Sequence, residues 1–283
     1  MLKLMQKGLI KKVLEAAGMS DCNTRGSPAL TSPFGTDADG PHRKDPWNYA
    51  SIVGMLMYLL SNAHPEIQFL VHQCARFTHC PRASHEEAVK HICQYLQGVQ
   101  DNGLTFKPNS DLQLNCYVDA DFAGLWNYES DQDPVCVRSR TGYVMTLGGC
   151  PIQWSSKLQT EIALSTTEAE YIALSQAMRE LIPLRRLLLE IATAMRLPEN
   201  KESVIKSTVF EDNNGAIATA TAVKMSPRTK HIGVKYHFFK SHVNDESGIS
   251  LSKIDTNLQK ADIFTKGLAP QKFAEIRKLL CGW

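Results

Sequence analysis

The spacing of the apolar residues changes near Gly103, and this change limits the folds that the chain can adopt. Between residues 47 and 100, apolar side chains recur every three or four positions, which predicts helices. Between residues 112 and 118 they alternate with polar side chains, which predicts a strand with one buried face. We therefore expect a mainly helical region that is followed by a region built around a sheet.

The second region alternates between predicted strands and predicted helices. Strands are predicted at 112–118, 142–147, 151–155, 203–211 and 248–254, and helices at 165–191 (interrupted by Pro183), 213–220, 231–243 and from 258 to 265. Three consecutive strands followed by alternating units predict an α/β fold, with a mixed five-stranded sheet and helices packed on it. Upstream, residues 1–19 are expected to form a short helix. Residues 20–46, which hold four prolines, are expected to form a linker.

Composition narrows the class of protein. Of the 283 residues, 43% are hydrophobic and 21% charged, which is typical of a globular protein and not of a disordered or fibrous one. The net charge is only +2, so a nucleic-acid partner cannot be inferred from the total charge. The longest apolar run, near residues 52–60, is too short to cross a bilayer, and the N-terminus resembles no signal peptide. The eight cysteines form no C-x-x-C pair, so we expect an intracellular protein with reduced thiols and no membrane partner.

Four carboxylates stand at predicted strand ends or helix starts, where a sheet presents side chains to a ligand. Asp119 ends the first strand, Asp212 follows the fourth, and Asp262 lies in the first turn of the last helix. At the start of the long helix two glutamates compete. Ser165 and Glu168 have the spacing of a capping box, in which Glu168 bonds the amide of the capping residue, so Glu170 is the better ligand candidate.

Carboxylates gathered in this way repel one another unless cations neutralise them. Oxygen ligands of this charge suit Mg²⁺ or Mn²⁺ better than zinc. Two such ions about 4 Å apart can activate water and stabilise the leaving oxygen in phosphodiester hydrolysis. Taken singly, each acid is more often a helix cap or a surface charge, so their spacing alone only suggests a metal site.

The acids lie within longer motifs that occur in one known family, in the same order along the chain. These motifs are Tyr117-Val-Asp-Ala-Asp-Phe-Ala-Gly, Ser139-Arg-Thr-Gly-Tyr, Ile152-Gln-Trp-Ser-Ser-Lys, Ala163-Leu-Ser-Thr-Thr-Glu-Ala-Glu-Tyr-Ile-Ala-Leu, Glu211-Asp-Asn-Asn-Gly-Ala-Ile, Arg228-Thr-Lys-His-Ile and Gln259-Lys-Ala-Asp-Ile-Phe-Thr-Lys-Gly-Leu. They resemble the ribonuclease H domain at the C-terminal end of the Pol polyprotein of copia-type LTR retrotransposons. Upstream motifs resemble the segment that joins the polymerase to that domain, so the resemblance covers nearly the whole chain.

The resemblance implies an organisation and an activity. Residues 1–46 would be the end of the reverse transcriptase and a linker, 47–110 a helical connection, 111–268 a ribonuclease H-like domain and 269–283 a C-terminal tail. The implied activity is two-metal hydrolysis of the RNA strand of an RNA–DNA hybrid, with Mg²⁺ or Mn²⁺ held by Asp119, Glu170, Asp212 and Asp262, and with Asp119 touching both ions. The implied partner is the upstream polymerase module, and the implied location a cytoplasmic virus-like particle or the nucleus.

One motif resembles part of a polymerase active site, but a polymerase site is not expected in this chain. Tyr117-Val-Asp-Ala resembles the Tyr-x-Asp-Asp turn of polymerases, but Ala120 replaces the second aspartate. The remaining polymerase acids would lie upstream of Met1, so we predict no DNA synthesis by this chain alone. A competing interpretation is a relic fragment that folds and binds nucleic acid without turnover.

A basic stretch is the candidate for nucleic-acid binding. From residue 213 to residue 244 there is no acidic side chain, and the stretch holds Lys224, Arg228, Lys230, Lys235 and Lys240. These residues form either a surface that contacts phosphates or simply a solvated helix face.

Overall fold

The structure is a computed structural model that describes residues 1–28, 35–109, 112–126, 135–196, 205–222, 232, 236–243 and 247–283. The chain divides into two compact units. A helical unit comprises Met1–Phe106, Ala123–Arg138 and Ile263–Trp283, and a sheet unit comprises Lys107–Phe122 and Ser139–Asp262. In the described part of the chain, no helix combines the length and the apolarity needed to cross a membrane.

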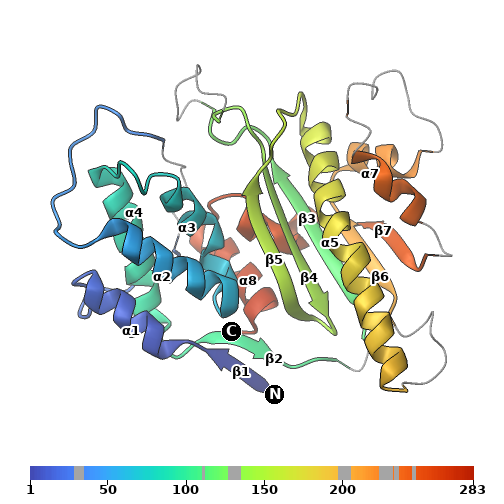
Figure 1. The fold of residues 1–283 in the computed structure, drawn as a ribbon, viewed down its shortest axis with the longest axis horizontal. Coiled ribbons are helices and arrows are strands. Elements are labelled where there is room, and N and C mark those ends of the chain that lie inside the picture. Colours follow the sequence, from blue (N-terminus) through green and yellow to red (C-terminus); the bar gives the residue numbers. More distant parts are fainter. Residues whose placement is uncertain are drawn as a thin grey trace. The chain divides into compact units, whose positions relative to one another are not determined.

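Helices form most of the helical unit (Figure 1). They are α1 (Lys7–Ala16), α2 (Tyr49–Asn62), the 3-10 turn η1 (Pro65–Ile67), α3 (Gln68–Ala75), α4 (Ala83–Gly98) and α8 (Pro270–Cys281). The apolar stripe predicted for residues 52–60 is buried in α2, where Leu56 and Leu59 are completely inaccessible. Helix α8 lies in the predicted C-terminal tail, and its Phe273 packs edge-on against Tyr95 of α4, with 5.6 Å between ring centroids. The helical character expected of this region is therefore confirmed.

The first residues of the chain differ from the prediction of one helix over 1–19. Strand β1 (Leu2–Met5) precedes α1 and pairs antiparallel with β2 (Gly103–Phe106). Met5 lies opposite Gly103, where an added Cβ would overlap the carbonyl of Leu4, so only glycine fits this close approach. The predicted helix is confirmed over Lys7–Ala16 and was wrong for Leu2–Met5, because the partner strand lies about a hundred residues away and local spacing carries no sign of it.

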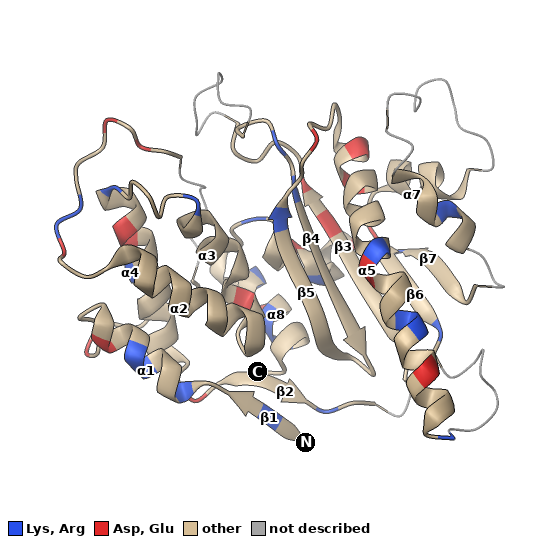
Figure 2. Ribbon diagram, in the orientation of Figure 1, with Lys and Arg blue, Asp and Glu red and all other residues tan. Residues whose placement is uncertain are grey.

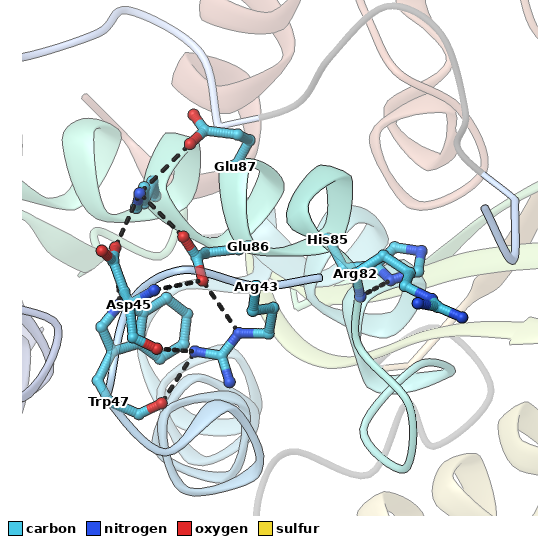
Figure 3. A network of polar contacts seen from close by, with 8 residues as sticks. Arg43, Asp45, Trp47, Arg82, His85, Glu86 and Glu87 are labelled. Atoms are coloured by element: carbon cyan, nitrogen blue, oxygen red, sulfur yellow. Dashed lines mark hydrogen bonds and ion pairs between the residues drawn. The ribbon is translucent and has the colours of Figure 1, made fainter. Parts of the chain in front are cut away.

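Charged side chains hold the described end of the predicted linker against α4 (Figure 3). Arg43 Nε lies 3.1 Å from Glu86 Oε2, and Lys90 Nζ lies 2.8 Å from Asp45 Oδ2 and 3.1 Å from Glu86 Oε1. The guanidinium of Arg43 also stacks 4.3 Å from the ring centroid of Trp47. Side-chain contacts thus fix residues 43–47, at the end of the predicted linker, to α4 of the helical unit.

A second polar network lies inside the helical unit around Glu66. Its carboxylate contacts the Nδ1 of His64 at 2.8 Å and accepts a hydrogen bond from the hydroxyl of Tyr95 at 3.2 Å. The thiol of Cys281 donates to the other oxygen at 3.5 Å. Burial raises the pKa of Cys281 well above its usual range, and the nearby charge of Glu66 adds to the shift. One buried acid therefore joins η1, α4 and α8.

The sheet unit contains the predicted five-stranded mixed sheet. Its strands are β3 (Leu114–Asp121), β4 (Arg140–Leu147), β5 (Cys150–Leu158), β6 (Ser207–Glu211) and β7 (Ile249–Lys253). Their order is β5-β4-β3-β6-β7, in which β5, β4 and β3 run antiparallel while β6 and β7 continue parallel to β3. An antiparallel meander continued by two parallel strands is the ribonuclease H-like arrangement, so the predicted fold class is confirmed.

Helix α5 (Thr166–Ala194) lies against one face of the sheet and covers the apolar side chains of that face (Figure 1). Alternate residues of β3, including Cys116 and Val118, join buried α5 residues such as Leu174 in one apolar cluster. The helix continues through Pro183, so the predicted interruption was wrong. The shorter α7 (Asn214–Thr221) follows β6.

Two segments predicted to be helices have 3-10 geometry in their described residues. The described residues of 231–243 contain the 3-10 helix η4 (Phe238–His242). The helix expected from residue 258 is replaced by two 3-10 turns, η5 (Thr256–Leu258) and η6 (Lys260–Phe264). In a 3-10 turn the backbone N–H of each residue bonds the carbonyl of the third residue before it. Over so few residues, the spacing of apolar side chains in a 3-10 turn cannot be distinguished from that in the first turn of an α-helix.

Candidate metal centre at the end of the sheet

Asp119 lies on β3 at the point where that strand loses one neighbour. Its pairing with β4 continues, with Asp119 opposite Gly142. Its parallel pairing with β6 stops earlier, with Tyr117 opposite Phe210. Asp212 follows the last residue of β6, so the carboxyl ends of two neighbouring parallel strands bring Asp119 and Asp212 to one edge of the sheet.

The N-terminal end of α5 carries Glu170 to the same edge. Ser165 caps the helix, and its hydroxyl accepts the backbone N–H of Glu168 at 3.2 Å, as the capping spacing predicts. The carboxylate of Glu168 accepts the N–H of Leu164 at 2.9 Å, one residue before the expected amide of Ser165. Glu168 is therefore engaged in the cap, which leaves Glu170 as the ligand candidate that the sequence predicts.

Three of the four predicted acids meet. One carboxylate oxygen each from Asp119, Glu170 and Asp212 lie within 4.8 Å of one another. We call this group the acid cluster. Asp119 is 2% exposed and Glu170 5%, while Asp212 is half-buried. Figure 2 shows the acidic colouring at the end of β3 and in the first turns of α5.

The ligand atoms of the acid cluster fit a hard divalent cation. Carboxylate oxygens are the preferred ligands of Mg²⁺ and Mn²⁺, and within 4.8 Å they are close enough to share an ion. Negative charges held this close, and mostly out of water, destabilise the fold unless a cation or bound protons compensate them. Among the described residues, the acid cluster is the group in which three potential ligand atoms from His, Cys, Asp or Glu side chains lie within 4.8 Å of one another.

Asp262 lies outside that group of three. It is 3% exposed in η6, and its backbone N–H donates to the carbonyl of Gln259 at 3.4 Å. The side-chain amide of Gln259 in turn donates to the carbonyl of Val118, the residue before Asp119, at 2.8 Å. The turn that carries Asp262 is thereby bonded to β3. That Asp262 completes a metal site stays a prediction.

Glu211, which the sequence interpretation overlooked, is a fourth acid at this edge. It is completely buried at the end of β6, and its Oε1 accepts the N–H of Asn213 at 3.0 Å. Burial raises the pKa of Glu211 well above its usual range; the bond from Asn213 opposes the shift, and the charges of Asp212 and Asp119 add to it. Strand alternation offered a signal, since Glu211 is in phase with the buried Val209.

Most of the predicted nucleic-acid contacts are residues that the structure does not describe. Lys224, Arg228, Lys230 and Lys235 lie outside the described residues. Lys240 lies in η4 and is half-buried, and this burial lowers its pKa. Binding of nucleic acid by these residues stays a prediction.

The chain is similar to long transposon proteins, although no family model matches it. It is 37% identical over 285 residues to the "Retrovirus-related Pol polyprotein from transposon TNT 1-94" of Nicotiana tabacum, an alignment that covers 98% of this chain and 20% of the relative. It is 32% identical over 272 residues to the corresponding polyprotein from transposon RE1 of Arabidopsis thaliana, covering 96% of this chain and 17% of the relative. The chain thus spans about a fifth of these relatives.

Among solved structures, two of LC11-RNase H1 are similar, one of them "in complex with RNA/DNA hybrid". The first has a TM-score of 0.36 and 18% identity, and the hybrid complex has a TM-score of 0.34 and 16% identity. Each alignment covers 54% of this chain and 93% of that protein. The strand order of the sheet, rather than these weak superpositions, identifies a ribonuclease H-like domain. The sequence relationship identifies the rest: the chain belongs to the retrovirus-related Pol polyproteins of copia-type transposons.

Proposed function

We propose that the sheet unit hydrolyses the RNA strand of RNA–DNA hybrids with the help of two divalent cations. The observation that carries this proposal is the acid cluster, whose carboxylates come from β3, α5 and the end of β6 and lie within 4.8 Å of one another. Membership of the Pol family and the ribonuclease H-like strand order support it. The nuclease would occupy the predicted span 111–268.

The chain's own residues would hold the ions and orient the scissile phosphate. Asp119, Glu170 and Asp212 would bind metal directly, and Asp262, which Gln259 connects to β3, would complete the set. When bound, the ions supply an activated water and a stabilised leaving oxygen. Burial of Asp119 and Glu170 keeps competing water from their carboxylates and strengthens their attraction for a cation.

The substrate and the partners follow from the same proposal. A hybrid would be recognised by its 2′-hydroxyls and phosphates rather than by its bases. The basic residues Lys224, Arg228, Lys230, Lys235 and Lys240 are the proposed phosphate contacts, so affinity would fall as salt rises. We further propose that the upstream polymerase module is the working partner, within a cytoplasmic virus-like particle or the nucleus.

The test is cleavage of labelled hybrid, duplex DNA and duplex RNA by the full chain in Mg²⁺. We expect cleavage of the RNA in the hybrid only, and a loss of about 10³-fold or more in Glu170→Gln, which removes several kcal/mol of metal-dependent stabilisation. Glu168→Gln is the matched control, because it makes the same change two residues away, at a carboxylate that accepts the N–H of Leu164 in the helix cap. Equal losses in both variants, or undiminished cleavage by Asp119→Asn, would refute the site.

The competing function is binding without turnover. It is favoured if the wild-type chain binds hybrid at low salt but leaves it intact in both Mg²⁺ and Mn²⁺. No primer extension is expected in either case, because the polymerase acids are not among the motifs of this chain.

A further inference from the structure

Two buried glutamines have equivalent positions relative to the acids. The side-chain amide of Gln259 donates to the carbonyl of Val118 at 2.8 Å, and that of Gln159 donates to the carbonyl of Ala169 at 2.8 Å. Val118 directly precedes Asp119, and Ala169 directly precedes Glu170. Both glutamines are completely buried. A side-chain amide therefore binds the backbone immediately before each of two members of the acid cluster.

Gln259 joins two of the segments that carry acids. The parallel pairing of β3 with β6 ends at Tyr117. The side-chain amide of Gln259 donates to the next carbonyl of β3, that of Val118. Its side-chain oxygen accepts the N–H of Ala261, the residue before Asp262, at 3.3 Å. One side chain is thus bonded to the backbone on the N-terminal side of Asp119 and of Asp262.

Gln159 joins α5 to the sheet in the same way. An amide nitrogen carries two hydrogens, and that of Gln159 donates to Ala169 and, at 3.1 Å, to the hydroxyl of Thr141. Thr141 lies on β4 opposite Ala120, the residue after Asp119. The backbone N–H of Gln159 also donates to the carbonyl of Ser139 at 2.8 Å. The first turn of α5 is thereby fixed to the strand beside Asp119.

We propose that Gln159 and Gln259 are positioning residues of the metal centre, an inference that rests on the proposed function. Neither would touch the metal or the substrate. They hold the backbones of Asp119, Glu170 and Asp262 in place against the mutual repulsion of the acids, so that the carboxylates are already arranged when a cation arrives. Loss of either amide would let the acids move apart and weaken cation binding more than it weakens the fold.

The experiment measures Mn²⁺ binding to the full chain by titration calorimetry, without substrate, for the wild type, Gln159→Met and Gln259→Met. Methionine keeps the length and volume of glutamine but removes the donor. We expect each variant to bind Mn²⁺ about 10–100-fold more weakly, the range for residues that support metal ligands. The Mg²⁺ concentration for half-maximal hybrid cleavage should rise by a similar factor, while kcat at saturating Mg²⁺ changes less.

Gln153→Met is the matched control. The amide of Gln153 also connects the sheet to α5, donating to Glu180 at 3.1 Å, but Glu180 lies ten residues along the helix from Glu170, about 15 Å away. Its Mn²⁺ affinity should equal that of the wild type. Each variant is assayed at a temperature at which its circular dichroism shows it folded. If Gln159→Met does not fold, the milder Thr141→Val, which removes one of the two acceptors of Gln159, should show a smaller loss of Mn²⁺ affinity in the same direction.

The outcomes separate this proposal from the proposed function. Failure of the wild type to bind Mn²⁺ would contradict the metal centre itself. Binding by the wild type with unchanged affinity in the folded Gln159 and Gln259 variants would overturn only the positioning role. An equal loss in Gln153→Met would also overturn it, because the effect would then follow from any lost contact between sheet and helix.

Discussion

The two units bury carboxylates in opposite ways. In the helical unit, Glu66 lies among His64, Tyr95 and Cys281, and each of these side chains contacts the carboxylate. In the sheet unit, the acid cluster brings three carboxylates close together, and burial raises the pKa of the neighbouring Glu211, a shift to which the charges of Asp212 and Asp119 add. The protein itself supplies the partners of Glu66, whereas under the proposed function a cation would offset the repulsion within the acid cluster.

Under the proposed function, this difference distinguishes an acid that joins segments of the fold from acids that bind a ligand. A buried acid with its partners in place joins segments of a fold, and removing it leaves those partners without an acceptor. Acids that repel one another lower stability, and such a cost is typical of sites kept for a ligand. The same substitution, the loss of one buried carboxylate, should therefore have opposite effects on the stability of the two units.

The largest expected effect on stability is that of Glu66→Ala. This change leaves His64 and Tyr95 buried without their acceptor and opens a cavity, so we expect a loss of about 3 kcal/mol in the free energy of unfolding. Urea unfolding of the full chain at pH 7 measures it. Glu66→Gln, which keeps an acceptor oxygen and nearly the same volume, should lose less. If both variants lost under 1 kcal/mol, the Glu66 network would not stabilise the helical unit.

The pH dependence of the helical unit gives a second, smaller effect. Burial lowers the pKa of His85, whose Nδ1 accepts the N–H of Arg82 at 2.9 Å and whose Nε2 lies 2.8 Å from the carbonyl of Gly35. Burial likewise lowers the pKa of His91. Because the unfolded chain then binds protons that the folded chain does not, stability is complete above pH 6.5 and falls as the pH drops below it.

The slope of that fall is at most about 1.4 kcal/mol per pH unit for each histidine. Unfolding midpoints between pH 7.5 and 5 measure it, and His85→Gln should flatten the curve below pH 6.5. An unchanged slope in this variant would show that His85 does not titrate as its burial indicates.

The smallest effect compares the same helix cap in both units. Asn48 caps α2 by accepting the N–H of Ser51 at 2.9 Å, and Asn213 caps α7 by accepting that of Ala216 at 3.0 Å. Replacing either asparagine by alanine should cost about 1 kcal/mol of stability. Only Asn213→Ala, which alters the residue after Asp212, should also weaken Mn²⁺ binding in calorimetry. Equal Mn²⁺ affinities in the two variants would show that the cap does not support the acid cluster.

Sequence patterns predicted the sheet unit well where a pattern is local. Alternation placed Cys116 and Val118 in the core, and the cap formed by Ser165 separated Glu168 from Glu170. The meeting of Asp119, Glu170 and Asp212 followed from their places at strand ends and a helix start. Each of these signals lies within a few residues of the feature that it predicts.

Contacts that depend on distant segments could not be predicted. Strand β1 depends on a partner that begins at Gly103, and Gln259 depends on a carbonyl of β3 that lies 141 positions away. A glutamine is most often a surface residue, so the residue type alone gives no sign that Gln259 is buried. Glu211 was missed for a different reason, because the adjacent Asp212 offered a simpler candidate at the same strand end.

The most direct test of the acid cluster compares the thermal unfolding of the wild-type chain and of Asp119→Asn, each with EDTA and with Mg²⁺ but without nucleic acid. Without metal, Asp119→Asn should be at least as stable as the wild type, because one repelling charge is gone. Mg²⁺ at a hundred times its dissociation constant should stabilise the wild type by about 2.7 kcal/mol and leave the variant nearly unchanged. A wild-type midpoint that does not respond to Mg²⁺, or an equal rise in Asp119→Asn, would contradict a metal centre at this edge of the sheet.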